Sequence, residues 1–279
     1  MKIFNLNKTI AVAHKESFYT IDDITWDELL NQPMLFSFLL NKIQMLKPVA
    51  DLETINSQEV GVPMGSQEVW AAGVTYLRSK LARMEESEES GGATFYDKVY
   101  DAERPELFFK ANAHRVIPSG GKVRIRKDSS WNVPEPELVL VVNASGSIVG
   151  YTIGNDMSSR SIEGENPLYL PQAKVYDGSA AIGPCVLVRE EEDIDPATGI
   201  SIEIRRNEKV VYAASTSINQ MKRKHAELVD FLYREYSFPQ GAFLMTGTCL
   251  VPDEDFTLNS GDAIAISIDG IGTLQNTVA

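Results

Sequence analysis

An acidic pair directly before a long apolar run is the feature that most constrains the fold of this chain. Glu135 and Glu137 precede residues 138–142, which are all Leu or Val. An unbroken apolar run of this length predicts a buried strand. Side chains two positions apart in a strand point to the same face, so the two carboxylates should converge on one place. Their repulsion at the edge of an apolar core would be relieved by a cation between them.

A third carboxylate follows on the next strand-like segment. Residues 148–156 read as a strand that ends at Asp156, and residues 143–147 form a natural hairpin turn before it. Asp156 can then reach the place where Glu135 and Glu137 point. Three carboxylates without Cys or a nearby His favour Mg²⁺, with Mn²⁺ or Ca²⁺ also compatible. The alternative stays open that the glutamates are solvated acids and that Asp156 is a helix N-cap.

Composition limits the other possibilities. The 279 residues, of which 43% are hydrophobic, can bury one large core or two unequal ones. A net charge of -13 argues against a nucleic-acid partner. The two cysteines lack a C-x-x-C spacing, so free thiols in a reducing compartment are the default expectation. The sequence shows neither a membrane-spanning stretch nor the apolar core of a signal peptide. We therefore expect a cytoplasmic protein that binds neither nucleic acid nor membrane.

Two regions of the chain differ in their pattern. The first contains a helical pattern at residues 24–30 and a second apolar stretch at 34–40. The second is a series of short strand-like segments separated by Gly, Pro, Asn and Asp. These segments span residues 70–74, 107–110, 123–125, 138–142, 148–153, 182–188, 200–205, 241–246 and 263–268. The pattern predicts an α+β fold, with a small N-terminal α/β domain at residues 1–63 before a β-rich mixed domain at 64–279.

Several short motifs together carry a family resemblance. They are Glu-x-Glu-Leu at 135–138, Gly-Tyr-x-x-x-Asn-Asp at 150–156, Ser-Arg at 159–160, a Lys at 174 ahead of Gly-Pro at 183–184, Thr-Gly-Thr at 246–248 and the tail 268–276. In this order, over about residues 68–278, they resemble the fumarylacetoacetate hydrolase superfamily. The resemblance implies a β-rich catalytic domain, a Mg²⁺ ion held by Glu135, Glu137 and Asp156, and 2-keto or β-diketo acid substrates.

One segment departs from the family pattern and bears on the reaction type. Hydrolases and decarboxylases of the family carry Asn-Tyr-x-x-His, with a Glu one helical turn further on, to activate water. Here residues 75–79 read Thr-Tyr-Leu-Arg-Ser, and Ala82 stands at the Glu position. Hydrolysis then lacks its usual base. This segment and residues 158–177 resemble the branch of the family that dehydrates 2-keto-3-deoxy-D-arabinonate to 2,5-dioxopentanoate.

Two residues are candidates for proton transfer. Lys174 lies among small and apolar residues, and a lysine beside a cation can become a usable base, whereas an ordinary surface salt bridge is the alternative. Glu106 opens a strand and can point toward the metal site, although a solvated glutamate at that position would look the same.

Four residues are candidates for substrate binding. They are Arg78, Ser79, Arg160 and Thr248. The arginines can hold a substrate carboxylate, but they can equally serve as structural partners of acids such as Asp156. The Thr248 hydroxyl can donate to the same carboxylate.

Three functions compete at this point. The first is a Mg²⁺-dependent dehydratase of sugar-acid catabolism. The second is a hydrolase or decarboxylase of a β-diketo acid of the acylpyruvate type, and the third is a non-catalytic scaffold that binds a metal or a 2-keto acid. The missing His and Glu separate the first two, and the intact set of three carboxylates together with Lys174 argues against the third. We expect a small 2-keto acid as ligand, and a homodimer or homotetramer because exposed sheet edges need cover.

Overall fold

Two β-sheets build most of the computed structural model, which describes residues 1–6, 9–49, 60–79, 98–190 and 193–279. In chain order the strands are β1 (Lys2–Leu6), β2 (Thr9–His14), β3 (Ser17–Ile21), β4 (Val60–Gly61), β5 (Glu68–Gly73), β6 (Glu106–Asn112), β7 (Val116–Ile117), β8 (Lys122–Val123), β9 (Asn132–Val133), β10 (Pro136–Val142), β11 (Ile148–Asp156), β12 (Ser158–Ser159), β13 (Ala180–Leu187), β14 (Gly199–Arg206), β15 (Lys209–Ser217), β16 (Ala242–Met245), β17 (Ala263–Ile268) and β18 (Gly272–Val278). Each predicted strand segment overlaps one of these strands, and the α+β class is confirmed.

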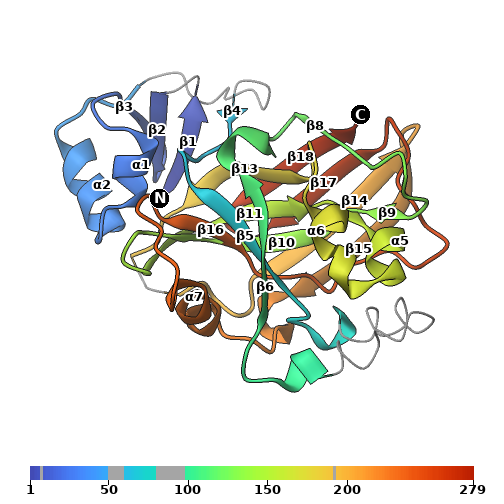
Figure 1. Cartoon of the computed structure of the whole chain (residues 1–279). Coiled ribbons are helices and arrows are strands. Elements are labelled where there is room, and N and C mark those ends of the chain that lie inside the picture. Colours follow the sequence, from blue (N-terminus) through green and yellow to red (C-terminus); the bar gives the residue numbers. More distant parts are fainter. Residues whose placement is uncertain (7–8, 50–59, 80–97, 191–192) are drawn as a thin grey trace.

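The larger sheet has 11 strands and the smaller one has five (Figure 1). The larger sheet runs β3-β2-β1-β13-β11-β10-β16-β5-β6, with β4 beside β1 and β7 beside β13. The smaller sheet runs β15-β14-β17-β18-β8, and β12 and β9 form a separate pair. The strands that carry the predicted carboxylates, β10 and β11, therefore lie in the interior of the larger sheet.

Short helices cover parts of the sheets. Those that the structure describes are α1 (Trp26–Leu30), α2 (Leu35–Gln44), α5 (Arg160–Glu165), α6 (Leu170–Lys174) and α7 (His225–Tyr233), with the 3-10 turns η2 (Ala113–Arg115), η3 (Pro167–Tyr169) and η4 (Ile218–Gln220). A capping box starts α1, where Thr25 and Glu28 exchange side-chain and backbone hydrogen bonds. Helix α1 forms where the sequence predicts a helix, and α2 begins within the second apolar stretch.

The N-terminal strands extend the larger sheet. β1 pairs with β13, with Lys2 opposite Leu187 and Ile3 opposite Val186. In Figure 1 the helices α1 and α2 lie with β2 and β3 at one end of the molecule. A division of the chain at residue 63 stays a prediction, because residues 50–59 lie outside the described part.

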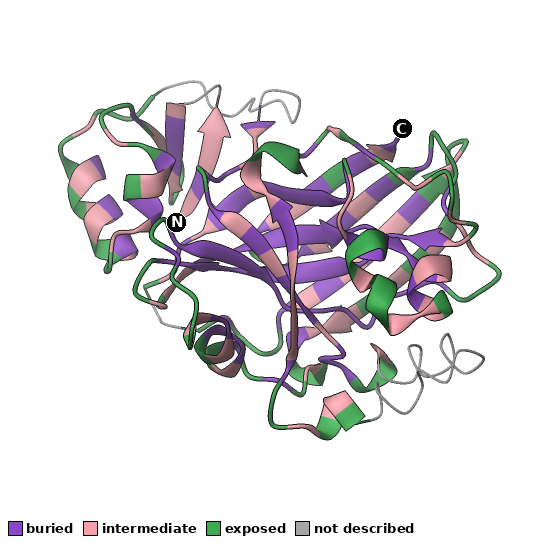
Figure 2. Cartoon of the chain, in the orientation of Figure 1, coloured by how far each residue is buried: buried purple, intermediate pink, exposed green. Residues whose placement is uncertain are grey.

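Strand β10 is buried on both faces, as the apolar run predicts. Leu138, Leu140 and Val142 belong to the core that the larger sheet shares with the smaller sheet and α7. Val139 and Val141 belong to a second core, which includes apolar side chains of α1 and α2. Figure 2 shows the central strands buried and the ends of the molecule more exposed. Glu135 and Glu137 point to the same face of the strand as Val139 and Val141. The carboxylates therefore lie at the start of the face that packs on the second core.

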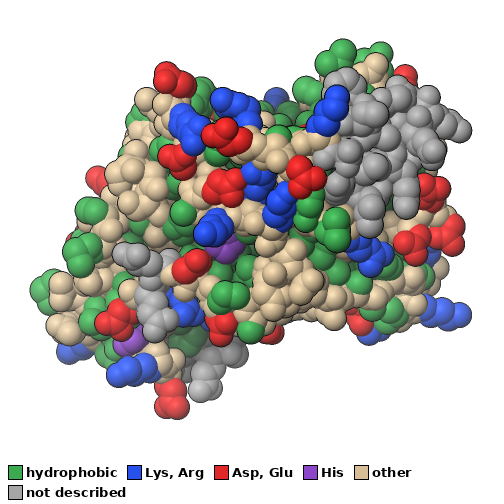
Figure 3. All heavy atoms as spheres, turned by 90° about the horizontal axis from the view of Figure 1, so that it is seen from below, with side chains coloured by type: hydrophobic (Ala, Val, Ile, Leu, Met, Phe, Trp, Pro, Cys, Tyr) green, Lys and Arg blue, Asp and Glu red, His purple; other side chains and the backbone are tan. Residues whose placement is uncertain are grey.

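The outer surface carries charges of both signs. On the face shown in Figure 3 the Lys and Arg side chains lie interspersed with Asp and Glu. Among the helices of the described residues, none is long and apolar enough to cross a membrane.

Candidate active site

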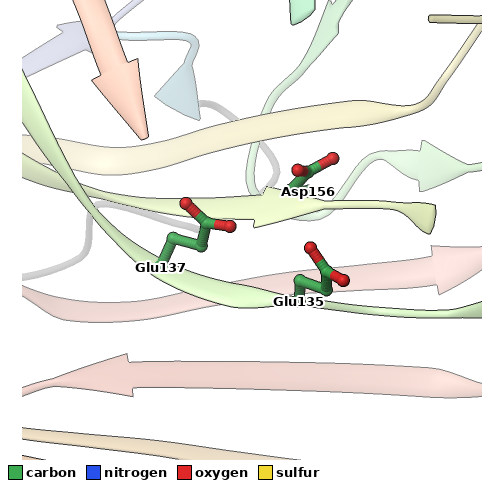
Figure 4. Close-up of side chains that lie close together, drawn as sticks. All are labelled: Glu135, Glu137 and Asp156. Atoms are coloured by element: carbon green, nitrogen blue, oxygen red, sulfur yellow. The ribbon is translucent and has the colours of Figure 1, made fainter. Parts of the chain in front are cut away.

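Three carboxylates meet where the β10–β11 hairpin opens (Figure 4). The antiparallel register places Glu137 opposite Gly154 and Pro136 opposite Asn155, which brings the end of β11 beside the start of β10. Glu135, Glu137 and Asp156 each offer an oxygen within 4.8 Å of the others. These residues are 3%, 1% and 1% exposed, and Asp156 lies in a strand, so the solvated-acid and N-cap interpretation does not hold.

Two glycines lie close to Glu137 in tightly packed surroundings. Gly154 lies opposite it across the hairpin, and a Cβ there would fall 2.7 Å from Val139 Cγ2. Gly247 has a φ of +91°, and its N–H donates to Glu137 Oε2 at 2.6 Å. A Cβ on Gly247 would lie 2.1 Å from Thr75 Oγ1, so no other residue fits this close approach.

Lys174 lies at the centre of the carboxylate cluster. It ends α6, and its Nζ donates to Glu135 Oε2 at 2.6 Å, to Asp156 Oδ2 at 3.0 Å and to Ser158 Oγ at 2.5 Å. Glu163 Oε1 lies 3.4 Å from the same nitrogen. The lysine is buried, so the surface salt bridge considered from the sequence is excluded.

A second buried lysine, Lys110, was not identified from the sequence. Its Nζ lies 2.5 Å from Asp156 Oδ1 and donates to the carbonyl oxygens of Lys174 and Met157 at 2.5 and 3.0 Å. The β5–β6 register steps from Ala111 to Phe109, so Lys110 is the extra residue of a β-bulge. A bulge re-aims a side chain, and here it directs the lysine to a carboxylate. The signal in the sequence was a lone cation inside an apolar strand.

Arg160 is a third buried cation beside the carboxylates. It begins α5, and its guanidinium contacts Glu135 Oε1 and lies 3.5 Å from Glu163 Oε2. All three side chains are buried. The geometry places Arg160 as an ion-pair partner of a carboxylate in the cluster. Arg160 also lines a cavity to which the three carboxylates contribute.

The electrostatics of the cluster are those of a cation site. Burial raises the pKa of Glu137 well above its ordinary value, and the charges of Asp156 and Glu135 raise it further. Burial likewise lowers the pKa of Lys110, against the opposing effect of Asp156. Three oxygen ligands that converge and repel one another suit a hard divalent ion such as Mg²⁺. The residues present therefore fit this metal.

Two of the predicted substrate-binding residues lie at the cavity. Ser79 and Thr248 line the cavity with Gly73, Val74 and Phe108. The Ser79 hydroxyl donates to Tyr76 O at 2.7 Å, and Thr248 Oγ1 accepts from Leu250 N at 3.1 Å.

Arg78 and Glu106 do not belong to the residues that line this cavity. Arg78 is largely exposed, 3.7 Å from Asp253. Glu106 starts β6, and its carboxylate lies against Gly73, which does line the cavity. Ala82 falls outside the described residues. The roles of the predicted site residues stay predictions.

Replacing Lys110 with methionine should lower the free energy of unfolding by about 3–5 kcal/mol, because it strips a partner from a buried carboxylate. Urea denaturation measures this. Lys42→Met is the matched control, since the Lys42–Asp23 pair has the same 2.5 Å separation but lies at the surface, where an ion pair contributes little. Equal losses in both variants would contradict the buried ion pair.

The sequence matches the family model described as "Fumarylacetoacetate (FAA) hydrolase C-terminal" over residues 69–279. The chain belongs to the fumarylacetoacetate hydrolase family, as its motifs predicted.

Two relatives and one solved structure are similar over most of the chain. A probable 2-keto-3-deoxyxylonate dehydratase of Haloferax volcanii is 50% identical over 217 residues, 78% of this chain and 74% of that protein. The 2-dehydro-3-deoxy-D-arabinonate dehydratase of Saccharolobus solfataricus is 40% identical over 251 residues, 88% of this chain and 78% of that protein. A structure of 2-keto-3-deoxy-D-arabinonate dehydratase complexed with magnesium and 2,5-dioxopentanoate has a TM-score of 0.85 and 33% identity, and covers 100% of this chain and 98% of that one.

Proposed function

We propose that this protein is a Mg²⁺-dependent dehydratase that converts a 2-keto-3-deoxy pentonate to 2,5-dioxopentanoate. The observation that carries the proposal is the buried cluster of Glu135, Glu137 and Asp156 with the Lys174 amine among them. The dehydratase names of two relatives, and the magnesium and product in the similar structure, support it. They also favour dehydration over hydrolysis, in line with Ser79 at the position of the hydrolases' His. For sugars of the D series the xylonate and arabinonate names denote one compound, because C4 is the only stereocentre left.

The three carboxylates would hold the metal. When bound, Mg²⁺ would polarise the 2-keto group of the substrate and make the C3 protons more acidic. A divalent ion held by Glu135 and Asp156 would favour the neutral amine of Lys174, which is the form that accepts a proton.

The chain's own groups would then move the protons. Lys174 takes a proton from C3, and Glu106 donates one to the C4 hydroxyl, which leaves as water. Transfer of a proton from C5 to C3, and from the C5 hydroxyl to C4, gives the aldehyde. Arg160, Ser79 and Thr248, which line the cavity, would contact the substrate, whereas Arg78 is exposed and lies outside this lining. A cytoplasmic location and a homodimer or homotetramer stay predictions.

Purified protein with Mg²⁺ should turn over a 2-keto-3-deoxy-D-pentonate and leave an acylpyruvate unchanged. NMR of the reaction mixture distinguishes the products, because 2,5-dioxopentanoate carries an aldehyde proton. Rapid cleavage of the acylpyruvate with no loss of the pentonate would contradict the proposal and favour a hydrolase.

A further inference from the structure

The end of β5 carries a glycine whose missing side chain leaves space for a carboxylate. Gly73 closes β5 and pairs with Glu106, the first residue of β6. A Cβ atom on Gly73 would lie 1.9 Å from Glu106 Oε2, 2.6 Å from its Cδ and 3.3 Å from its Cγ. The outer half of the Glu106 side chain therefore lies across Gly73, in space that any other residue would fill.

This arrangement places Glu106 beside the cavity. Gly73 lines the cavity together with Phe108. Directly paired residues of antiparallel strands share a face, and so do residues two apart in one strand, so Glu106 lies on the face of Phe108. The Phe108 ring lies next to Lys174, whose Nζ is 5.7 Å from the ring centre. Phe108 thus connects the Glu106 side of the cavity to the lysine.

The backbone at Gly73 is held firmly. β5 pairs with β6 up to Gly73 itself, and with β16 up to Ala71. The next residue, Val74, has a φ of +52°, which is rare and strained for a β-branched residue and persists only where its surroundings fix it. Thr75 provides that restraint, because its Oγ1 donates to Thr246 O at 2.7 Å and its carbonyl accepts from Lys222 N at 2.9 Å. A methyl group on Gly73 would therefore displace the Glu106 carboxylate rather than the strand.

We infer that Gly73 is a positioning residue, which holds the Glu106 carboxylate in place for proton transfer by leaving the space it occupies. The inference rests on the proposed dehydration and on the role that it gives to Glu106. The φ angle of Gly73 lies outside the left-handed region, so the backbone there accepts alanine. Only the Glu106 carboxylate has to move.

Gly73→Ala should lower kcat by about the factor that Glu106→Gln causes, in the range of about 10²- to 10⁴-fold expected for a lost proton donor. The KM, the Mg²⁺ affinity and the midpoint of thermal unfolding should stay unchanged. The double variant should be no slower than Glu106→Gln alone, because the carboxylate is already lost. Gly65→Ala is the matched control: its Cβ would lie 2.1 Å from Asp27 Oδ1, away from the cavity, and kcat should stay at the wild-type value.

Four outcomes would overturn the inference. They are a wild-type kcat in Gly73→Ala, a wild-type kcat in Glu106→Gln, a loss that adds to that of Glu106→Gln, and a higher KM with kcat unchanged, which would mean that the methyl group takes up substrate space. If the wild-type protein does not dehydrate the pentonate, the proposed function fails by itself. A crystal structure of Gly73→Ala then decides: a displaced Glu106 carboxylate supports the inference, and an unmoved one overturns it.

Discussion

The Lys174→Met variant should lose dehydration turnover by about 10²- to 10⁴-fold, while it still binds Mg²⁺ and a non-reacting 2-keto acid such as pyruvate. The amine donates to both Glu135 and Asp156, so its loss removes the proposed base without removing a proposed metal ligand. Steady-state kinetics measures the first effect and calorimetry the second.

The same substitution should have a second signature in stability. Without metal, Glu135 and Asp156 lose a buried partner, and the free energy of unfolding should fall by about 3–5 kcal/mol. Added Mg²⁺ should restore most of this loss, because the ion supplies the missing positive charge. A variant that retains wild-type turnover would show that the proton goes elsewhere.

Glu137→Gln should weaken Mg²⁺ binding by about 100-fold or more, since even residues that only support metal ligands change affinity by about 10- to 100-fold. Activity should vanish in EDTA for the same reason. The amide oxygen of glutamine still accepts from Gly247 N, so the local backbone stays in place. Calorimetry measures the affinity, and Glu203→Gln, on the exposed side of β14, is the control. Unchanged affinity in Glu137→Gln would mean that the metal site has been placed wrongly.

Glu137→Gln should also change how stability depends on pH. Because the pKa of Glu137 is raised in the folded protein, the folded state holds this proton to higher pH than the unfolded chain does. Metal-free wild-type protein therefore loses stability as pH rises from the ordinary glutamate pKa to the raised one. The variant lacks this loss. Urea denaturation without metal should show an advantage of Glu137→Gln that is small at acidic pH and grows as pH rises.

The carboxylate cluster could be predicted because its geometry is local. Glu135 and Glu137 are two apart in one strand, and Asp156 follows after a single short hairpin, so strand periodicity and a turn signal suffice to bring them together. The burial of β10 on both faces followed from its unbroken apolar run in the same way.

Lys110 could not be placed by such reasoning. Its direction depends on a bulge in the pairing of β6 with β5, and β5 ends more than 30 residues earlier in the chain. The strands β15 and β18 were also not predicted. β15 lies at the edge of the smaller sheet and is largely exposed, and its apolar residues 210–214 do not alternate with polar ones as in a half-buried strand.

The Gly73–Glu106 contact is a third kind of feature. It joins the ends of paired strands, and a glycine at the end of a strand reads in a sequence as an ordinary turn signal. Only the geometry shows that the absent side chain leaves space for a carboxylate.

The mixture of buried cations and carboxylates has a consequence for the order of events in the cell. Lys110, Arg160 and Lys174 offset three of the four charges of Glu135, Glu137, Asp156 and Glu163, so the cluster is within one charge of neutrality before any metal enters. Many small metalloproteins fold only when the ion arrives. In this chain three buried cations already offset most of the carboxylate charge, so we expect the polypeptide to fold before it binds the metal.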